Sequence, residues 1–157
     1  MAELMAVPFI PSRIARGVIF RELSTTAGVV AVVGENIHYG VNAPQSSHGE
    51  PSFPYCLFQM EFSAFDGAVG TYQYEHILSA EMRFTVEFHD VGMSDNRIAD
   101  AWVAMMEALS GQVFDEPDGT QVTISSLGET PVPPINEGGR RYQRLGTTFS
   151  VTVTRGG

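Results

Sequence analysis

Residues 77–89, ILSAEMRFTVEFH, decide the fold of this chain. From residue 78 onward, apolar side chains occupy the even positions and polar side chains occupy the odd positions. The apolar set is Leu78, Ala80, Met82, Phe84, Val86 and Phe88. Successive side chains of a strand point to opposite faces of a sheet, so this pattern predicts a long strand with one dry face and one wet face.

The segment that follows supplies a cover for the dry face. Its apolar residues recur at helical spacing, at Ile98, Trp102, Met105, Met106 and Leu109. Ser94 is the expected cap of this helix, and Gly111 follows its last apolar residue. A strand that leads into an amphipathic helix predicts an α+β fold. We expect a single domain with a mostly antiparallel sheet packed against two helices.

The N-terminal part of the chain supplies the other predicted helix. Residues 1–11 contain two prolines and no periodicity, so we expect an extended arm there and a single α+β domain over 12–157. Ser12 is the expected cap of a helix whose apolar stripe is Ile14, Val18, Ile19 and Leu23. The run GVVAVVG at 28–34 fits a short helix or a buried strand, and its periodicity does not decide between them. A short strand is expected at 37–40.

A second alternating segment precedes the central strand and predicts a long β-hairpin. Over 53–65, one face is expected to carry Cys56, Phe58, Met60 and Phe62. A turn at 66–70 joins this strand to the next. The second arm, from about residue 73 to residue 89, spans roughly 50 Å at ~3.3 Å per residue, so it is longer than most strands. We therefore expect the hairpin to project beyond the body of the protein.

The tip of this hairpin supplies the first candidate contact residues. They are Phe65, Asp66, Tyr72 and Tyr74. Exposed aromatic side chains are enriched at protein interfaces. Ordinary cross-strand packing is the alternative interpretation of Tyr72 and Tyr74.

The C-terminal part is expected to complete the sheet. A Pro-Asp-Gly turn at 117–119 joins strands at 113–114 and 122–124, and the strand over 141–154 alternates and should lie inside the sheet. Residues 130–139 contain three prolines and are expected to form a long loop, because proline removes hydrogen-bond donors from a sheet. The candidate contact residues of this region are Pro133, Pro134, Arg140 and Arg141.

Composition limits the possible partners. The chain has 157 residues and a net charge of −9, which disfavours a direct grip on nucleic acid. The N-terminus lacks the pattern of a signal peptide, and no apolar run reaches the ~20 residues that cross a bilayer, so no membrane association is expected. Cys56 is the only cysteine and lies in an apolar run, which favours a buried structural thiol.

No constellation of reacting groups emerges from the sequence. The four histidines are dispersed without metal-ligand spacing, and no phosphate-binding glycine loop or nucleophile elbow is present. His89, Asp90 and Asp95 are the only residues that we can nominate for a small binding or enzymatic domain. His89 and Asp90 are expected on the wet face or in the loop before Ser94. We therefore expect no enzymatic activity, no metal and no cofactor.

The order of these elements resembles the tail-completion or tail-terminator proteins of long-tailed, siphovirus-like bacteriophages and gene-transfer particles. The resemblance covers roughly residues 12–154. It is carried by IHYG at 37–40, APQ at 43–45, PY at 54–55, the helix over 94–109 and the basic segment RRYQR at 140–144. The loop at 129–139 is longer than in that family, and the proline-bearing arm is a second departure.

The resemblance implies a structural virion protein that is assembled in the host cytoplasm. Such a protein forms a ring, usually a hexamer, at the head-proximal end of the tail, ends polymerisation of the tail tube and joins the tail to the head connector. Its implied partners are sister copies, the tail tube protein and a connector or stopper protein, and DNA passes through the lumen without specific binding. Another neck or tail component, such as a stopper or a tube subunit, is the alternative.

Overall fold

The computed structural model describes residues 9–40, 52–67, 77–130 and 134–156, and for 62–67, 77–78 and 129–130 it describes the backbone only. The described residues form three helices, which are α1 (Pro11–Thr25), α2 (Ala27–Val33) and α3 (Asn96–Leu109). They also form seven strands, which are β1 (Ile37–Tyr39), β2 (Tyr55–Gly67), β3 (Ile77–Val91), β4 (Gln112–Asp115), β5 (Gln121–Thr130), β6 (Ile135–Glu137) and β7 (Arg140–Thr154).

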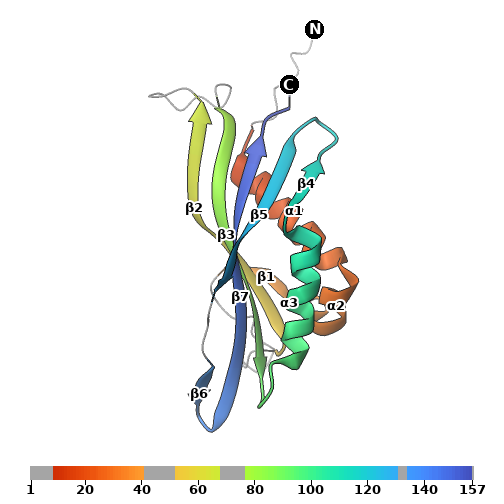
Figure 1. Cartoon of the computed structure of the whole chain (residues 1–157), viewed down its shortest axis with the longest axis vertical. Helices are drawn as coiled ribbons and strands as arrows, with labels where there is room; N and C mark the ends of the chain where they lie inside the picture. The colour runs from red at the N-terminus through yellow and green to blue at the C-terminus, as the bar shows by residue number, and fades with distance from the viewer. Residues whose placement is uncertain (1–8, 41–51, 68–76, 131–133, 157) are drawn as a thin grey trace.

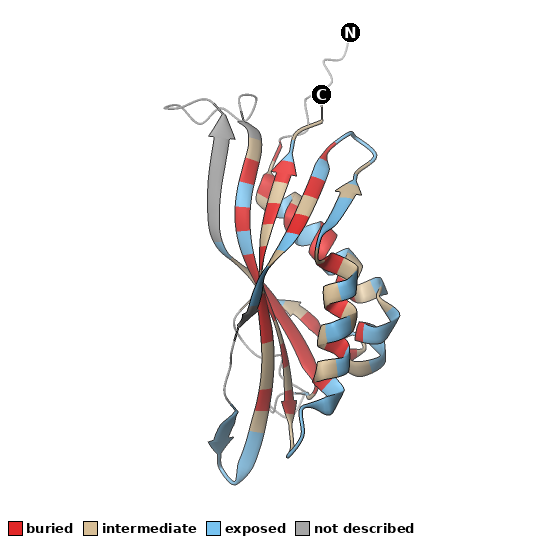
Figure 2. Ribbon diagram, viewed as in Figure 1, coloured by how far each residue is buried: buried red, intermediate tan, exposed pale blue. Residues whose placement is uncertain are grey.

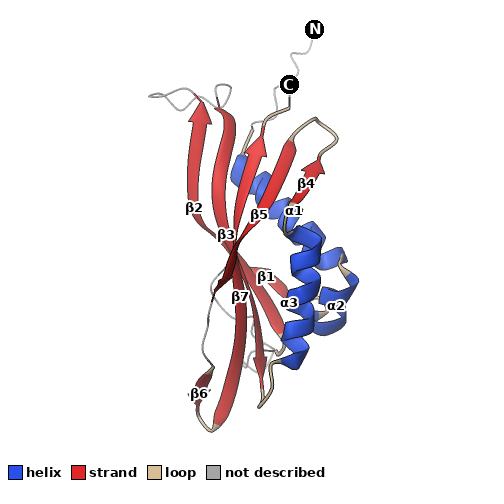
Figure 3. Ribbon diagram, viewed as in Figure 1, coloured by secondary structure: helices blue, strands red, loops and turns tan. Residues whose placement is uncertain are grey.

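The seven strands belong to one curled sheet, as expected for a single α+β domain. Their order is β1-β2-β3-β7-β5-β4, and β6 adds to β7 outside this path. Only the β1–β2 pair is parallel among the pairs of described strands. The three helices lie together on one side of the sheet (Figure 3), where α1 and α3 contact the strands and α2 packs mainly on α3. The predicted mostly antiparallel sheet is confirmed, with one helix more than the two expected.

The alternation that predicted β3 is confirmed. Its apolar side chains from Ala80 to Phe88 are fully buried against the helices, whereas Glu81 and Arg83 on the other face are exposed (Figure 2). The wet face becomes drier toward the end of the strand. Thr85 is 5% exposed there, and Leu57 of β2 is 6% exposed. The far face of the sheet therefore carries its own partly buried surface.

The predicted hairpin is formed by β2 and β3, which pair from Tyr55↔His89 to Gly67↔Ile77. A register shift between Met60 and Phe62 adds a residue to β2, so Phe62 lies opposite Arg83. A β-bulge of this kind breaks the alternation of the bulged strand. The pattern expected over 53–65 therefore holds only as far as Met60. The tip at 68–76 lies outside the described residues.

The helix boundaries differ slightly from those expected. Helix α1 begins at Pro11, one residue before the predicted cap Ser12, because proline suits the first turn, where its missing N–H is not needed. Residues 1–8 of the expected arm lie outside the described residues, and Phe9 is buried in the core. Asp95 is the N-cap of α3, and Ser94 Oγ accepts a hydrogen bond from the Asn96 N–H at 3.1 Å.

The Val-rich run is a helix rather than a buried strand. Helix α2 buries Val29 and Val33 and packs closely on α3. A Cβ atom placed on Gly28 would lie 2.5 Å from Cβ of Ala104, so the two helix backbones approach at a position that only glycine permits. This close approach explains the glycine at the start of the run.

The C-terminal strands follow the prediction with one correction. Strands β4 and β5 form the expected hairpin, and β7 lies inside the sheet between β3 and β5. The expected loop over 130–139 is wrong in part, because β5 extends to Thr130 and Ile135–Glu137 forms β6 against the start of β7. The prolines do not prevent this strand, since it lies after the last of them and at the edge of the sheet.

Candidate functional site

The long strands carry two hairpins to opposite ends of the molecule (Figure 1). Of the eight predicted contact residues, Tyr72, Tyr74 and Pro133 lie outside the described residues. Phe65 and Asp66 belong to β2 and pair with Ala80 and Ser79, but only their backbone is described. The other three are exposed and lie together around the β6–β7 hairpin, and they are Pro134, Arg140 and Arg141.

The β6–β7 hairpin is a narrow, exposed arm. Gly138 and Gly139 form its turn with φ of 59° and 78°, which is the left-handed conformation that favours glycine. Glu137 pairs with Arg140 across the ladder, and Asn136 pairs with Arg141. Every residue of β6 is exposed, and Ile135 is 40% exposed. The arm therefore presents a basic end and an apolar side chain to solvent.

Four rings gather at the base of this arm on the sheet face away from the helices. We call them the aromatic cluster, and they are Phe53, Tyr55, His89 and Tyr142. The Tyr55 and His89 rings stack with centroids 4.7 Å apart, and the Phe53 ring lies 5.2 Å from Tyr55 and 5.7 Å from Tyr142. Adjacent positions on β2, β3 and β7 create this arrangement, because Tyr55 pairs with His89 and His89 pairs with Arg144. Aromatic pairs at such distances add to the energy of burial.

The aromatic cluster borders a cavity of about 350 Å³, whose wall also includes Ile135, Glu137 and Arg144. Nε of Arg144 is buried and has no hydrogen-bond partner among the described residues. Burial raises the pKa of the Tyr55 phenol, and the nearby Glu87 carboxylate raises it further. A cavity lined by aromatic rings, with an unsatisfied guanidinium N–H in its wall, suits a partner that brings an apolar side chain and a hydrogen-bond acceptor.

Glu87 and His89 form a side-chain hydrogen bond beside this cavity. His89 Nε2 lies 3.1 Å from Glu87 Oε2. The hydrogen bond from His89 lowers the pKa of the Glu87 carboxyl, although burial opposes this shift. The hydrogen bond therefore stabilises the ionised form of the Glu87 carboxyl.

The grouping nominated for catalysis does not form a site. His89 and Asp90 are successive residues of β3, so their side chains lie on opposite faces of the sheet. Asp90 was expected on the wet face or in a loop, but it is 3% exposed on the helix side. Its carboxylate accepts hydrogen bonds from Arg97 at 2.7 and 3.1 Å and from the Val91 N–H at 2.8 Å. The ion pair anchors the start of α3 to the end of β3, and Asp95 is the N-cap of that helix.

The described ranges contain no group of three or more His, Cys, Asp or Glu side chains that could hold a metal ion. Cys56 is fully buried, and burial raises the pKa of its thiol well above the usual value. Among the described helices, none is long and apolar enough to span a membrane.

The sequence analysis did not predict that the four rings of the aromatic cluster would meet. Alternation places odd-numbered residues of β3 on the wet face, so His89 was expected to lie on that face. The rings meet only because β2, β3 and β7 are neighbours in a fixed register. A pattern that depends on register between three strands is not carried by any one segment.

No protein-family model matches the chain, and no curated protein matches it. Among solved structures, a chain in the virion of a native gene transfer agent particle has a similar fold, with a TM-score of 0.54. The similarity covers 87% of this chain and 92% of that chain, at 17% sequence identity. At this identity the likeness concerns the fold.

Proposed function

We propose that this protein is a structural virion subunit of a long-tailed phage or a gene-transfer particle. It forms a ring, as a hexamer, at the head-proximal end of the tail. There it ends polymerisation of the tail tube and presents a docking surface to the head connector. The observation that carries this proposal is the fold likeness to a chain of a gene transfer agent virion, which spans nearly the whole of both chains.

The shape of the molecule supports a role in assembly. Two hairpins lie at opposite ends of the long axis (Figure 1), so one subunit has separate surfaces for the tail side and the head side of a ring. The strand β4 pairs only with β5 among the described strands, and Val113 on it is 52% exposed. Exposed strand edges and arms favour contact with another chain. A closed ring requires heterologous contacts of this kind.

Charge supports a lumen that DNA can cross. Eighteen acidic residues against nine arginines leave the chain at −9. An anionic surface repels phosphate, so a genome slides through such a ring without adhering. The basic arm at Arg140 and Arg141 is then reserved for protein contacts, with acidic surfaces of the neighbouring tube or connector protein as its targets.

A stopper or a tube subunit of the same particle is the closest alternative, because it uses the same fold features. Removal of the gene followed by electron microscopy of the particles separates these roles. Overlong tails of variable length are the expected result, since nothing ends tube growth. Finished tails beside leaking heads indicate a stopper, and the absence of tubes indicates a tube subunit.

Complementation with the wild-type gene is the control, and it should restore a single tail length. Normal particles in the absence of the gene would contradict the proposed function altogether.

A further inference from the structure

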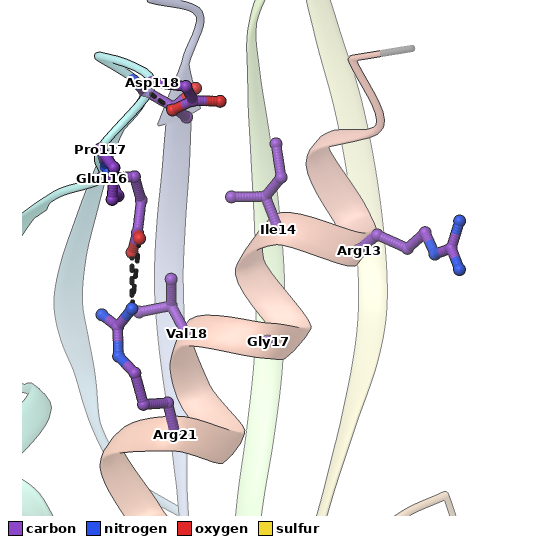
Figure 4. A pocket seen from close by; sticks show the side chains of 9 residues that line it. Arg13, Ile14, Gly17, Val18, Arg21, Glu116, Pro117 and Asp118 are labelled. Carbon is purple, nitrogen blue, oxygen red and sulfur yellow. Dashed lines mark hydrogen bonds and ion pairs between the residues drawn. The ribbon is translucent and has the colours of Figure 1, made fainter. Parts of the chain in front are cut away.

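The outer surface of α1 carries two arginines without an ion-pair partner among the described residues. Arg13 and Arg16 are both exposed. Arg21, on the same helix, differs because its Nη1 atom lies 3.0 Å from Glu116 Oε1 and 3.2 Å from Oε2. In Figure 4, Arg21 points toward Glu116 across a cavity of about 420 Å³, whereas Arg13 points away from the carboxylates on that side. Arg13 and Arg16 together line a different cavity beside α1, which Arg21 does not line.

Aromatic side chains accompany these arginines. We define the α1 arginine patch as Arg13, Arg16, Phe20 and Tyr39. The Arg16 guanidinium lies 4.1 Å from the centre of the Tyr39 ring, and Phe20 and Tyr39 are 46% and 40% exposed. The patch borders a cavity of about 490 Å³, where Nε2 of His38 is buried without a hydrogen-bond partner in the described part of the chain. Exposed arginine and aromatic side chains around a hollow are typical of interface hot spots.

A second surface has the complementary character. We define the α3 acidic stripe as Asp100, Val103 and Glu107, which are all exposed. Their spacing of three and four residues places them on one helix face, over about 10.5 Å at 1.5 Å per residue. Val103 is 49% exposed. Neither carboxylate has an ion-pair partner among the described residues, since Arg97 at the start of α3 is bound to Asp90.

We propose that the α1 arginine patch of one copy binds the α3 acidic stripe of a second copy. The patch is positively charged and the stripe is negatively charged, and each surface also has an exposed apolar side chain. Arg13 and Phe20 are seven positions apart along α1, as are Asp100 and Glu107 along α3, so the patch and the stripe have the same length. The two surfaces differ, so the contact is heterologous, and it repeats around a closed ring. The inference rests on the proposed ring function and names one of its subunit contacts.

Charge reversal tests this contact in the full-length protein. Variant one is Arg13→Glu with Arg16→Glu, and variant two is Asp100→Arg with Glu107→Arg. Each variant has two surfaces of the same sign, so its self-association should weaken by on the order of 100-fold or more, because like-charge contacts cost several kcal/mol. An equimolar mixture should associate again, since each patch then meets a stripe of opposite charge.

Sedimentation velocity at low and high salt measures the association, and circular dichroism verifies the fold of each variant. Wild-type association should weaken with added salt, because exposed charges are screened. Arg83→Glu, on the sheet face away from the helices, is the control charge reversal and should leave association unchanged. Equal association of wild type and variants, or a mixture that stays dissociated, would overturn the contact.

The outcomes also separate this contact from the proposed function. If the wild type associates and the variants associate equally, the contact is wrong while the ring proposal stands. If wild type stays monomeric at every concentration and gene removal leaves tails unchanged, both fail. If the α1 arginine patch or the α3 acidic stripe binds only a different virion protein and the chain does not self-associate, the proposed contact between copies is also wrong.

Discussion

Replacing Gly28 with alanine should destabilise this protein, although the same change usually stabilises a helix. The added Cβ would lie 2.5 Å from Cβ of Ala104, whereas carbon atoms pack at about 3.5–4.0 Å. Helices α2 and α3 must separate by about 1 Å or more to make room. Such overpacking costs about 1–3 kcal/mol, and the helix gain from glycine to alanine offsets about 0.5–1 kcal/mol. The net expectation is a loss of roughly 1–2 kcal/mol.

Gly17 provides the matched control, because a Cβ placed there has nothing within 4 Å. Gly17→Ala should therefore raise the free energy of unfolding by about 0.5–1 kcal/mol. For a chain of this size, the Gly28→Ala loss corresponds to a fall in Tm of about 2–8 °C. Urea denaturation and thermal melting followed by circular dichroism measure both variants.

A third variant tests the cause. In the Ala104→Gly background the clash is absent, so Gly28→Ala should lose its penalty there. This coupling is the signature of direct contact between the two positions. If Gly28→Ala stabilises the protein as much as Gly17→Ala does, the close α2–α3 approach is wrong.

Three further predictions concern single side chains. The Cys56 thiol should not react with a thiol reagent at pH 8 until the protein unfolds, because it is fully buried and burial raises its pKa; rapid labelling of the native protein would contradict this burial. Glu87→Gln should make the free energy of unfolding fall less as the pH is lowered. The lowered pKa of Glu87 means that its hydrogen bond with His89 stabilises the fold above the unfolded-state pKa, and this stabilisation is lost as the pH falls through the folded-state pKa. An unchanged pH dependence of the free energy of unfolding would refute this prediction. Trp102→Phe should cost about 1–3 kcal/mol, because the indole N–H donates to the buried Thr147 hydroxyl at 2.6 Å; Trp102→Phe should cost less in a Thr147→Val background, and additive losses would argue against this bond.

The sequence predicts those parts of the fold that depend on local pattern. The alternation over 78–88 and the helical spacing from Ile98 to Leu109 each describe one element packed on one core, and both were confirmed. Residues 28–34 stayed ambiguous because a short apolar run has no distinguishing period. The structure shows a helix that buries Val29 and Val33 and packs closely on α3 through Gly28, a tertiary contact that the run itself does not reveal.

The surroundings of the predicted contact residues were only partly foreseen. Pro134 was expected in a loop and Arg141 at the start of the last strand, and both lie exposed beside the β6–β7 hairpin, whose first strand, Ile135–Glu137, was not expected. The partner of Asp90 is seven residues away on a helix, and the aromatic cluster depends on the register of three strands. Such long-range contacts follow from topology, which local periodicity does not contain.

A subunit-resolution electron microscopy map of the particle that contains this chain tests the central claim most directly. The account predicts a closed ring of copies at the junction of tail and head, with one hairpin of each copy toward the tail tube and the other toward the connector. A map in which the chain lies away from the junction of tail and head, or touches no sister copy, would contradict the account.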